Sequence, residues 1–194
     1  MERAGFVIVV PIRAFALGKV RLAGLLDGPA RAALARELAG RVVAAAGSHP
    51  VVVVSSDPDV VAWTVARGRQ VLPDPGNLDA AAESGLRWAR SHGYARVVIA
   101  HGDLPLARTF DRVAADVSRP TMSIVPCHRD DGTPVLSLPS DVPFAFSYGP
   151  GSFRRHVTEA TRLGLGVRVL RDPNLAFDVD VPADLAWLAS EDVA

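Results

Sequence analysis

Runs of consecutive apolar residues alternate along this chain with segments of helical periodicity. Because the runs contain no regular polar positions, they predict short strands buried on both faces: Phe6–Ile12, Val51–Ser55, Val97–Ala100 and Thr121–Pro126. Apolar residues at helical spacing predict helices between and after these strands: Pro29–Ala46, Asp59–Ala66, Leu78–Ser91 and Leu106–Val117. Strands and helices in this alternation indicate βαβ units and a mostly parallel sheet.

The C-terminal third continues this architecture with more turns. The pattern predicts an extended segment at Gly132–Pro139, a turn at Gly149–Gly151 and a helix at Phe153–Leu163. A strand at Val167–Leu170 and a short closing helix at Pro182–Leu188 follow. No internal repeat, linker or low-complexity stretch separates these segments, so we expect residues 1–194 to form one α/β domain.

Composition and charge exclude several classes of protein. The 194 residues are 49% hydrophobic and carry a formal net charge of zero without a basic block, which argues against a nucleic-acid binder. Cys127 is the single cysteine, so no internal disulfide forms, and this usage suits a reducing compartment. The N-terminal run Phe6–Ile12 is too short for a membrane span and lacks the flanks of a secretory signal. We expect a cytoplasmic protein that does not enter the membrane.

The sequence also lacks several common catalytic motifs. No G-x-G-x-x-G follows the first strand, and the segment from Gly149 to Arg154 fails that pattern at its last position. Neither a P-loop nor a G-x-S-x-G nucleophile elbow occurs. Five scattered histidines and one cysteine give no zinc-ligand spacing. A standard dinucleotide-binding fold, a P-loop NTPase and an α/β-hydrolase are therefore excluded.

Cationic residues follow the first predicted strand. Ligands of open α/β sheets bind beyond the carboxyl ends of the strands. The loop Pro11–Gly24 lies there and carries Arg13, Lys19 and Arg21. Arginine binds phosphate oxygens in bidentate fashion and lysine acts as a mobile point charge, so the loop suits a polyphosphate. The alternative is a solvated loop with ordinary surface cations.

Three aspartates are candidates for a divalent metal site. Asp178 and Asp180 are two residues apart in an extended segment, so their carboxylates point to the same side. Two like charges at this spacing favour an intervening cation, and Mg²⁺ prefers carboxylate and phosphate oxygens. Alternatively, Asp180 only helps to start the helix at Pro182.

Asp103 follows a predicted buried strand in the sequence HGDLP, where it is either a turn residue or a third metal ligand. His101 could point the same way, although a structural histidine is the simpler interpretation. Three carboxylates facing Lys19 and the two arginines would suit phosphoryl or nucleotidyl transfer.

Two further loops are candidates for ligand contacts. Thr133 and the glycine-rich turn containing Gly149 precede Ser152, where a helix begins and its free N–H groups could bind an anion. Ser152 could equally be a plain N-cap. In the loop Leu72–Asn77, Asp74 precedes a helix for which Asn77 is the expected N-cap, and Asn77 could also read a base edge.

The order of these motifs resembles the 2-phospho-L-lactate guanylyltransferase family, which includes the phosphoenolpyruvate guanylyltransferases of coenzyme F-420 (deazaflavin) biosynthesis. The resemblance runs from about Val7 to Leu188 and rests on PIR…GKVRL, GDLP, DGT, SYGPGSFRRH and FDVDVPADL. It implies a single-domain nucleotidyltransferase with a Rossmann-like, three-layer α/β/α fold and a mostly parallel sheet. It also implies transfer of GMP from GTP to phosphoenolpyruvate or 2-phospholactate, with release of pyrophosphate.

The resemblance assigns roles to particular residues. It implies that Mg²⁺ is bound by Asp103, Asp178 and Asp180, with Lys19 and Asp103 as the catalytic pair. The residues expected to contact GTP are Pro11, Arg13, Lys19, Arg21, Asp74 and Asn77, and those expected to hold the small acid are Thr133, Gly149 and Ser152.

This chain departs from the family pattern at Val20 and Pro134, where a hydroxyl and an amide side chain are expected. Two other activities therefore stay open: nucleotidyl transfer to a sugar phosphate or a molybdenum-type cofactor, and nucleotide binding without turnover. The oligomeric state is open as well.

Overall fold

A seven-stranded sheet forms the centre of the computed structural model, which describes residues 5–115 and 120–191. The strands, in spatial order, are β3 (Gln70–Leu72), β2 (Val51–Val54), β1 (Phe6–Pro11), β4 (Arg96–Ala100), β6 (Val135–Pro139), β5 (Thr121–Val125) and β7 (Gly166–Val169). Strand β6 is antiparallel to its neighbours β4 and β5, and the other pairs are parallel. The prediction of a mostly parallel sheet is confirmed.

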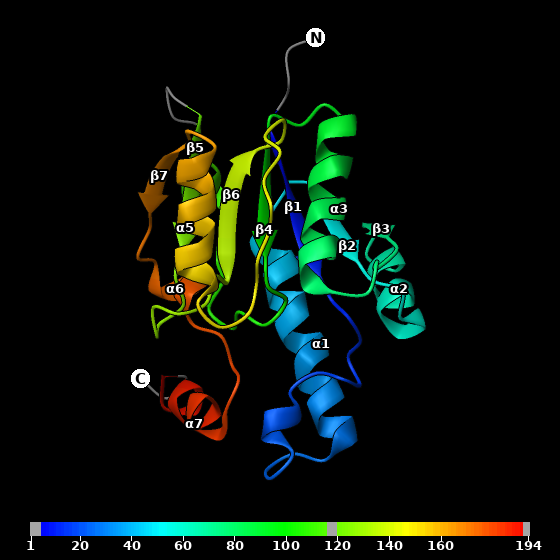
Figure 1. Ribbon diagram of the computed structural model, residues 1–194. Coiled ribbons are helices and arrows are strands. Elements are labelled where there is room, and N and C mark those ends of the chain that lie inside the picture. Colours follow the sequence, from blue (N-terminus) through cyan, green and yellow to red (C-terminus); the bar gives the residue numbers. More distant parts are fainter. Residues whose placement is uncertain (1–4, 116–119, 192–194) are drawn as a thin grey trace.

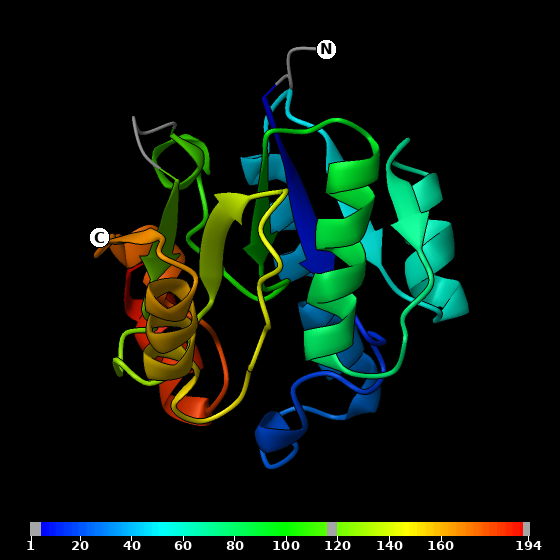
Figure 2. The ribbon, with the colours of Figure 1, turned by 45° about the horizontal axis from the view of Figure 1, so that its top comes forward.

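Helices cover both faces of this sheet (Figures 1 and 2). They are α1 (Gly28–Ala45), α2 (Pro58–Val65), α3 (Leu78–Ser91), α4 (Asp111–Ala114), α5 (Ser152–Arg162), α6 (Pro173–Ala176) and α7 (Pro182–Glu191). Ile8 and Val10 of β1 face a core shared with α1, α2 and α4, whereas Val7 and Val9 face a second core shared with α3 and α5. This alternation is the period of two of a strand, and it confirms the three-layer α/β/α fold.

The expected helix over Leu106–Val117 is wrong in the part that the structure describes. Only Asp111–Ala114 is helical, and residues 116 and 117 lie outside the described residues. Leu104 packs into the core under α1, while Leu106 packs against a separate cluster with Leu22 and Val179. Because the segment sends its apolar side chains into two different clusters, it follows an irregular path instead of a helix.

The pattern also missed three short elements. One is the 3-10 helix η1 (Val20–Leu22), which lies in the loop after β1 directly after Lys19. Strand β3 has only three residues, all partly exposed or exposed, and pairs in parallel with β2 at the edge of the sheet. Helix α6 is a four-residue helix capped by Asp172, whose carboxylate accepts from the backbone N–H of Asn174. In the described part of the chain, no helix has the length and apolar character needed to cross a membrane.

The pairing of β1 with β4 determines where the loops meet. The register pairs Phe6 with Arg96 and Val9 with Ile99, so the two strands end at the same edge of the sheet. Since β2 and β3 lie on one side of β1 and β4 on the other, this edge is a topological switch point, where open α/β sheets bind ligands. Figure 1 shows the loop after β1 and helix α7 gathered at this end.

The close packing of α3 on β1 gives a stability prediction. A Cβ atom at Gly85 would lie 2.4 Å from Cγ1 of Val9, whereas one at Gly40 in α1 would meet nothing within 4 Å. We expect Gly85→Ala to lower the free energy of unfolding by about 1–3 kcal/mol through overpacking. The matched variant Gly40→Ala should raise it by about 0.5–1 kcal/mol through helix propensity. Urea titration measures both, and a stabilising Gly85→Ala would contradict the packing argument.

Candidate active site

The Lys19 ammonium lies at the centre of a charged cluster beyond the carboxyl ends of β1 and β4. Its Nζ donates to Oδ2 of Asp103 and to the backbone carbonyl of Val179, both at 2.6 Å, and lies 3.9 Å from Oδ1 of Asp180. The side chain is only 6% exposed. Lys19 has a left-handed backbone, with φ 56° and ψ 35°, a conformation that non-glycine residues rarely adopt outside functional sites.

Apolar packing turns Asp178 and Asp180 toward the lysine. Val179, between them, is fully buried in a small cluster with Leu22, Leu38 and Leu188. Because successive side chains of an extended segment point to opposite sides, burial of Val179 directs both neighbouring carboxylates away from that cluster. The backbone N–H of Val179 also donates to the carbonyl of Asp103 at 3.4 Å, which joins this segment to the turn after β4. The three predicted carboxylates are thus brought close to one another: Asp103 and Asp180 flank Lys19, and both are near enough to Asp178 for their charges to affect its pKa.

Two further basic side chains contact the carboxylates. Arg21 donates to Oδ2 of Asp180 at 3.3 Å, and its own side chain is 73% exposed. Nδ1 of His128 lies 3.5 Å from Oδ1 of Asp178. No spacing signal in the sequence identifies His128, because this residue lies in the loop after β5 and reaches Asp178 only through the fold.

The carboxylates differ in their electrostatic surroundings. Burial alone would raise the pKa of Asp103, but the positive charges of Lys19 and His101 outweigh it and lower that pKa. At Asp178, burial and the negative charges of Asp103 and Asp180 raise the pKa. The positive charge of His101 lowers this pKa too, but by less than the other contributions raise it. The cluster therefore contains more negative charge than its resident cations neutralise.

These residues fit a divalent cation. Oδ1 of Asp103 and Oδ1 of Asp178 are buried and lack a hydrogen-bond partner within the described residues. Unpaired buried carboxylate oxygens are costly, and hard oxygen donors are what Mg²⁺ prefers. As the side chains stand, no three His, Cys, Asp or Glu residues of ranges 5–115 and 120–191 form a ready metal site. Lys19 holds Asp103 and lies within 3.9 Å of Asp180.

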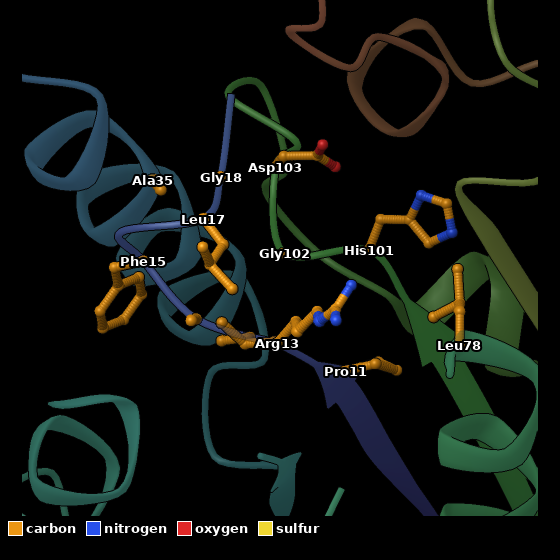
Figure 3. Close-up of a pocket in the computed structure, with 12 residues that line it drawn as sticks. Pro11, Arg13, Phe15, Leu17, Gly18, Ala35, Leu78, His101, Gly102 and Asp103 are labelled. Carbon is orange, nitrogen blue, oxygen red and sulfur yellow. The ribbon is translucent and has the colours of Figure 1, made fainter. Parts of the chain in front are cut away.

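A pocket with a cavity volume of about 250 Å³ opens beside this cluster (Figure 3). Its walls come from the loop after β1, the turn after β4, and one residue each of α1 and α3: Pro11–Phe15, Leu17, Gly18, Ala35, Leu78 and His101–Asp103. In Figure 3 the Arg13 side chain extends from the loop toward the turn at Gly102. Among the residues that the structure describes, none makes an ion pair or a side-chain hydrogen bond with the Arg13 guanidinium. A free cation in this position suits an anionic ligand.

A second pocket adjoins the first through Pro11 and Arg13. It extends to the loop before α3, and its lining includes Asp74 and Asn77. The predicted N-cap is confirmed, since the Asn77 side chain accepts from the backbone N–H of Ala80 at 2.9 Å. Asp74 likewise accepts from a backbone N–H in its own loop. These side chains shape the pocket wall, and together the two pockets form an elongated site with a cationic centre.

Thr133 and Ser152, which are candidates for one ligand site on sequence grounds, meet in the interior. Both are 1% exposed, and Oγ of Ser152 donates to Oγ1 of Thr133 at 3.2 Å. Buried His156 completes the group: its Nε2 accepts from the N–H of Ser147 at 3.0 Å, so Nδ1 carries the proton and faces Thr133 at 3.0 Å. Burial, together with nearby Arg155 and His101, lowers the pKa of His156 to about 4.

The start of α5 differs from the expectation for Ser152. The N-cap is Gly151, in a left-handed conformation with φ 74°, so a plain N-cap role for Ser152 is wrong. The helix end is also not an open anion seat. Asp131 already accepts from Gly151 N at 2.8 Å and, through its carbonyl, from Phe153 N at 3.1 Å. Gly149 lies in the turn just before, with φ 95°.

Tyr148 connects this interior group to the pocket. Its ring centroid is 4.9 Å from that of His156 and 5.4 Å from that of His101, which lines the pocket. Antiparallel pairing of β6 with β4 supports the same neighbourhood, since His101 N donates to the carbonyl of Pro134. The Thr133 group thus lies next to the turn that carries Asp103.

Asp184 fixes the segment that carries two of the carboxylates. Its Oδ2 accepts from the backbone N–H groups of Asp180 and Val181 at 2.7 and 2.8 Å, and its Oδ1 accepts from Arg129 at 2.9 Å. Asp184 is the third residue of α7, so this is the acidic half of a capping box. Asp184 fills the helix-starting role considered for Asp180, leaving the Asp180 carboxylate to face Lys19 and Arg21. The capping pattern was the signal that could have identified it.

Curated relatives match nearly the whole chain. Residues 6–190 match the model of a family described as guanylyl transferase CofC like. The phosphoenolpyruvate guanylyltransferase of Rubrobacter xylanophilus is 40% identical over 187 residues, covering 93% of this chain and 91% of that protein. The phosphoenolpyruvate guanylyltransferase of Chloroflexus aggregans is 36% identical over 184 residues, covering 89% and 91%.

A solved structure shares the fold at lower identity. A protein provisionally described as a nucleotide-diphospho-sugar transferase, from Desulfovibrio desulfuricans G20, superposes with a TM-score of 0.78 and 20% identity. The match covers 96% of this chain and 87% of that one. At this identity the similarity shows the nucleotidyltransferase-like fold alone.

The role of Asp184 predicts a loss of stability. Asp184→Ala leaves two backbone N–H groups and Arg129 without their acceptor, so the free energy of unfolding should fall by about 1–3 kcal/mol. Glu37→Ala is the matched control, because it removes a carboxylate from an exposed ion pair with Arg41 and should change stability by less than about 1 kcal/mol. Urea titration measures both, and equal effects would contradict the capping role.

Neutral, buried His156 predicts a pH dependence of stability. Its pKa of about 4 lies below the ordinary value of 6.5, so the unfolded state binds more protons between these values. Stability should therefore be lost as the pH falls below 6.5, with His156 accounting for about 2 kcal/mol between about pH 7 and pH 5.

In His156→Gln this part of the pH dependence should disappear, although the variant starts from a lower stability at neutral pH. Unfolding free energies at the two pH values measure the difference. Parallel pH profiles for the two proteins would show that His156 is not the titrating group.

Proposed function

This chain belongs to the CofC-like guanylyl transferase family, and we propose on this basis that it transfers GMP from GTP to a small phosphorylated acid. Phosphoenolpyruvate is the acceptor favoured by the names of the relatives, and 2-phospho-L-lactate is the second acceptor. Pyrophosphate is the other product. The step is proposed to belong to coenzyme F-420 biosynthesis and to take place in the cytoplasm.

One observation supports this function most strongly. The Lys19 ammonium contacts Asp103 at the mouth of a pocket that the unpaired Arg13 guanidinium enters. Carboxylates that can hold a metal ion and cations that can hold phosphate oxygens, next to one pocket, are the groups that transfer between phosphates requires. The pocket at the sheet edge and its continuation toward Asn77 give the elongated space that a nucleoside triphosphate needs.

The proposed reaction joins two phosphates. A phosphate oxygen of the acid attacks the α-phosphorus of GTP in line, a P–O bond forms, and the bond between the α-phosphorus and the bridging oxygen breaks. The electron pair leaves with pyrophosphate. Because the nucleophile is already an anion, no general base is needed, and the barrier consists mainly of repulsion between two anions. Arg13, Lys19 and Arg21 lower that repulsion by holding the phosphate oxygens.

Magnesium is proposed as the cofactor. Asp103, Asp178 and Asp180 are the residues that would hold it, supported by the two unpaired buried oxygens and the raised pKa of Asp178. When bound, Mg²⁺ supplies positive charge that neutralises the triphosphate and polarises the α-phosphate. Asp184 keeps the backbone of Asp180 in position for this role.

The acid is proposed to bind beside the turn after β4, near Thr133, Gly149 and Ser152. The buried hydroxyl pair of Thr133 and Ser152 determines the backbone path there, and Gly149 leaves the turn without a side chain. Asp74 and Asn77 are proposed to line the base end of the nucleotide, with Pro11 between base and phosphates.

A product assay tests this function. The protein is incubated with Mg²⁺, one nucleoside triphosphate and one acceptor, and adducts are identified by mass spectrometry. A guanylylated phosphoenolpyruvate or 2-phospholactate, formed with GTP in preference to ATP, CTP and UTP, is the expected result. A product only with a sugar phosphate would assign a different nucleotidyltransferase activity. GTP binding without any product would indicate a nucleotide-binding protein.

Asp103 gives the activity prediction. Asp103→Ala removes the partner of Lys19 and one proposed metal ligand, so we expect about 4 kcal/mol less transition-state stabilisation and about a thousandfold lower kcat. The rate is measured as pyrophosphate release in the presence of Mg²⁺. Glu37→Ala is the control and should retain activity, because Glu37 is an exposed residue of α1 that pairs only with Arg41 in the described structure. Unchanged turnover in Asp103→Ala would remove Asp103 from the mechanism.

A further inference from the structure

We propose that Lys19 is a resident cation of the carboxylate cluster, and that a divalent metal ion displaces it from Asp103 before its ammonium binds the nucleotide phosphates. The inference rests on the proposed function, because it concerns how that same site becomes loaded. It assigns Lys19 two successive partners: a carboxylate first and a phosphate afterwards.

Lys19 is chemically distinct from every other cation of the chain. Lysine and arginine together number 21, and Lys19 is the single lysine. An ammonium is a compact point charge with three donors on a flexible stem, whereas a guanidinium is a broad planar fork. Of all the protein's permanent cations, Lys19 thus most closely resembles a metal ion in size and charge distribution.

The contacts of Lys19 are those of a bound cation. It takes two oxygens at 2.6 Å, from Asp103 and from the carbonyl of Val179, and Asp180 lies on a third side at 3.9 Å. The side chain is 6% exposed, so this charge is held in the protein and not in solvent. By contrast, Arg21 contacts the same Asp180 with a side chain that is 73% exposed.

Lys19 leaves part of the negative charge unneutralised. Oδ1 of Asp103 and Oδ1 of Asp178 have no hydrogen-bond partner within the described residues, although Oδ2 of Asp103 is paired with the lysine and Nδ1 of His128 lies 3.5 Å from Oδ1 of Asp178. A divalent ion brings one more positive charge than an ammonium and can accept more oxygen ligands. Exchange of the lysine for such an ion is therefore favoured by the charge of the cluster.

The Lys19 ammonium cannot leave Asp103 before a metal ion has bound. Withdrawing the ammonium alone would leave Asp103 as a buried and uncompensated charge, which is strongly unfavourable. If the metal ion takes Asp103 in the same step, the charge stays paired and the ammonium is released. Metal binding and phosphate binding by Lys19 are then coupled, so each should strengthen the other.

The loop geometry allows the ammonium to move while the backbone stays in place. A Cβ atom on Gly18 would lie 3.2 Å from Ala35 and 3.3 Å from the carbonyl of Phe15, so the loop is tightly packed on α1. Gly18 and Asp103 both line the pocket proposed for the phosphates. Rotation of the flexible four-carbon lysine side chain is the movement that the proposal requires.

Metal binding without nucleotide is the first test, with Mn²⁺ as the probe and electron paramagnetic resonance as the readout. Lys19→Met removes the competing cation, so Mn²⁺ affinity should rise by about tenfold or more relative to the wild type. Arg21→Met is the matched control, because it removes the same charge from an exposed contact with Asp180. It should change the affinity by less than about threefold. Equal gains in the two variants, or weaker binding in Lys19→Met, would overturn the proposal.

The wild-type protein provides a second test that does not depend on the folding of a variant. Because the chain has one lysine, labelling with ¹³C-lysine gives a single set of side-chain signals in NMR spectra. Addition of Mg²⁺ alone should shift the Cε signal, and addition of GTP should shift it again. A Cε signal that stays unchanged while Mn²⁺ titration shows the site to be filled would refute displacement.

Both readouts are independent of turnover. If the protein does not transfer GMP but the Cε signal of Lys19 still shifts on addition of Mg²⁺, the proposed function is refuted and the exchange is supported. If the protein transfers GMP but the Cε signal of Lys19 does not shift, only the exchange is refuted.

Discussion

Parallel pairing of β1 with β4 is the constraint on which the rest of this site depends. The two strands are neighbours in the sheet although 84 residues separate Lys19 from Asp103, and their register ends both at the same edge. The loop that carries the cations and the turn that carries Asp103 consequently face each other. No local propensity of either loop would bring them together.

A small apolar cluster completes what the sheet begins. Val179 packs with Leu22, Leu38 and Leu188, and this packing joins the loop after β1, helix α1, the segment before α7, and α7 itself. Burying one valine between two aspartates turns both carboxylates into the site, while Leu22 anchors the short helix that follows Lys19. The hydrophobic effect thus positions charges that would otherwise repel one another.

The charged cluster lowers the stability of the fold, because its negative charges are only partly neutralised. Buried carboxylates are costly unless they are paired, and here Lys19 pairs with one of them while others keep unpaired oxygens. The excess negative charge that costs folding free energy is the charge that the proposed metal ion would neutralise. By contrast, the nearby hydroxyls of Thr133 and Ser152 are hydrogen-bonded to each other, and Thr133 also contacts His156.

The layers of the fold and the candidates Lys19, Asp103, Asp178 and Asp180 could be predicted from local sequence pattern, whereas His128 could not and Asp184 was missed. Continuous apolar strands and amphipathic helices report burial through their period, which is a local property, and the spacing of Asp178 and Asp180 fixes a common direction in the same way. Where burial did not follow a single period, as in residues 106–110, the prediction of a helix failed.

The contacts that the predicted residues make depend on the tertiary structure. It paired Lys19 with Asp103 and the carbonyl of Val179, gave the capping role to Asp184, and closed the start of α5 with Asp131. Each of these contacts depends on the distance between segments far apart in the chain, and that distance is set by strand order and side-chain packing. Local pattern carries no information about it.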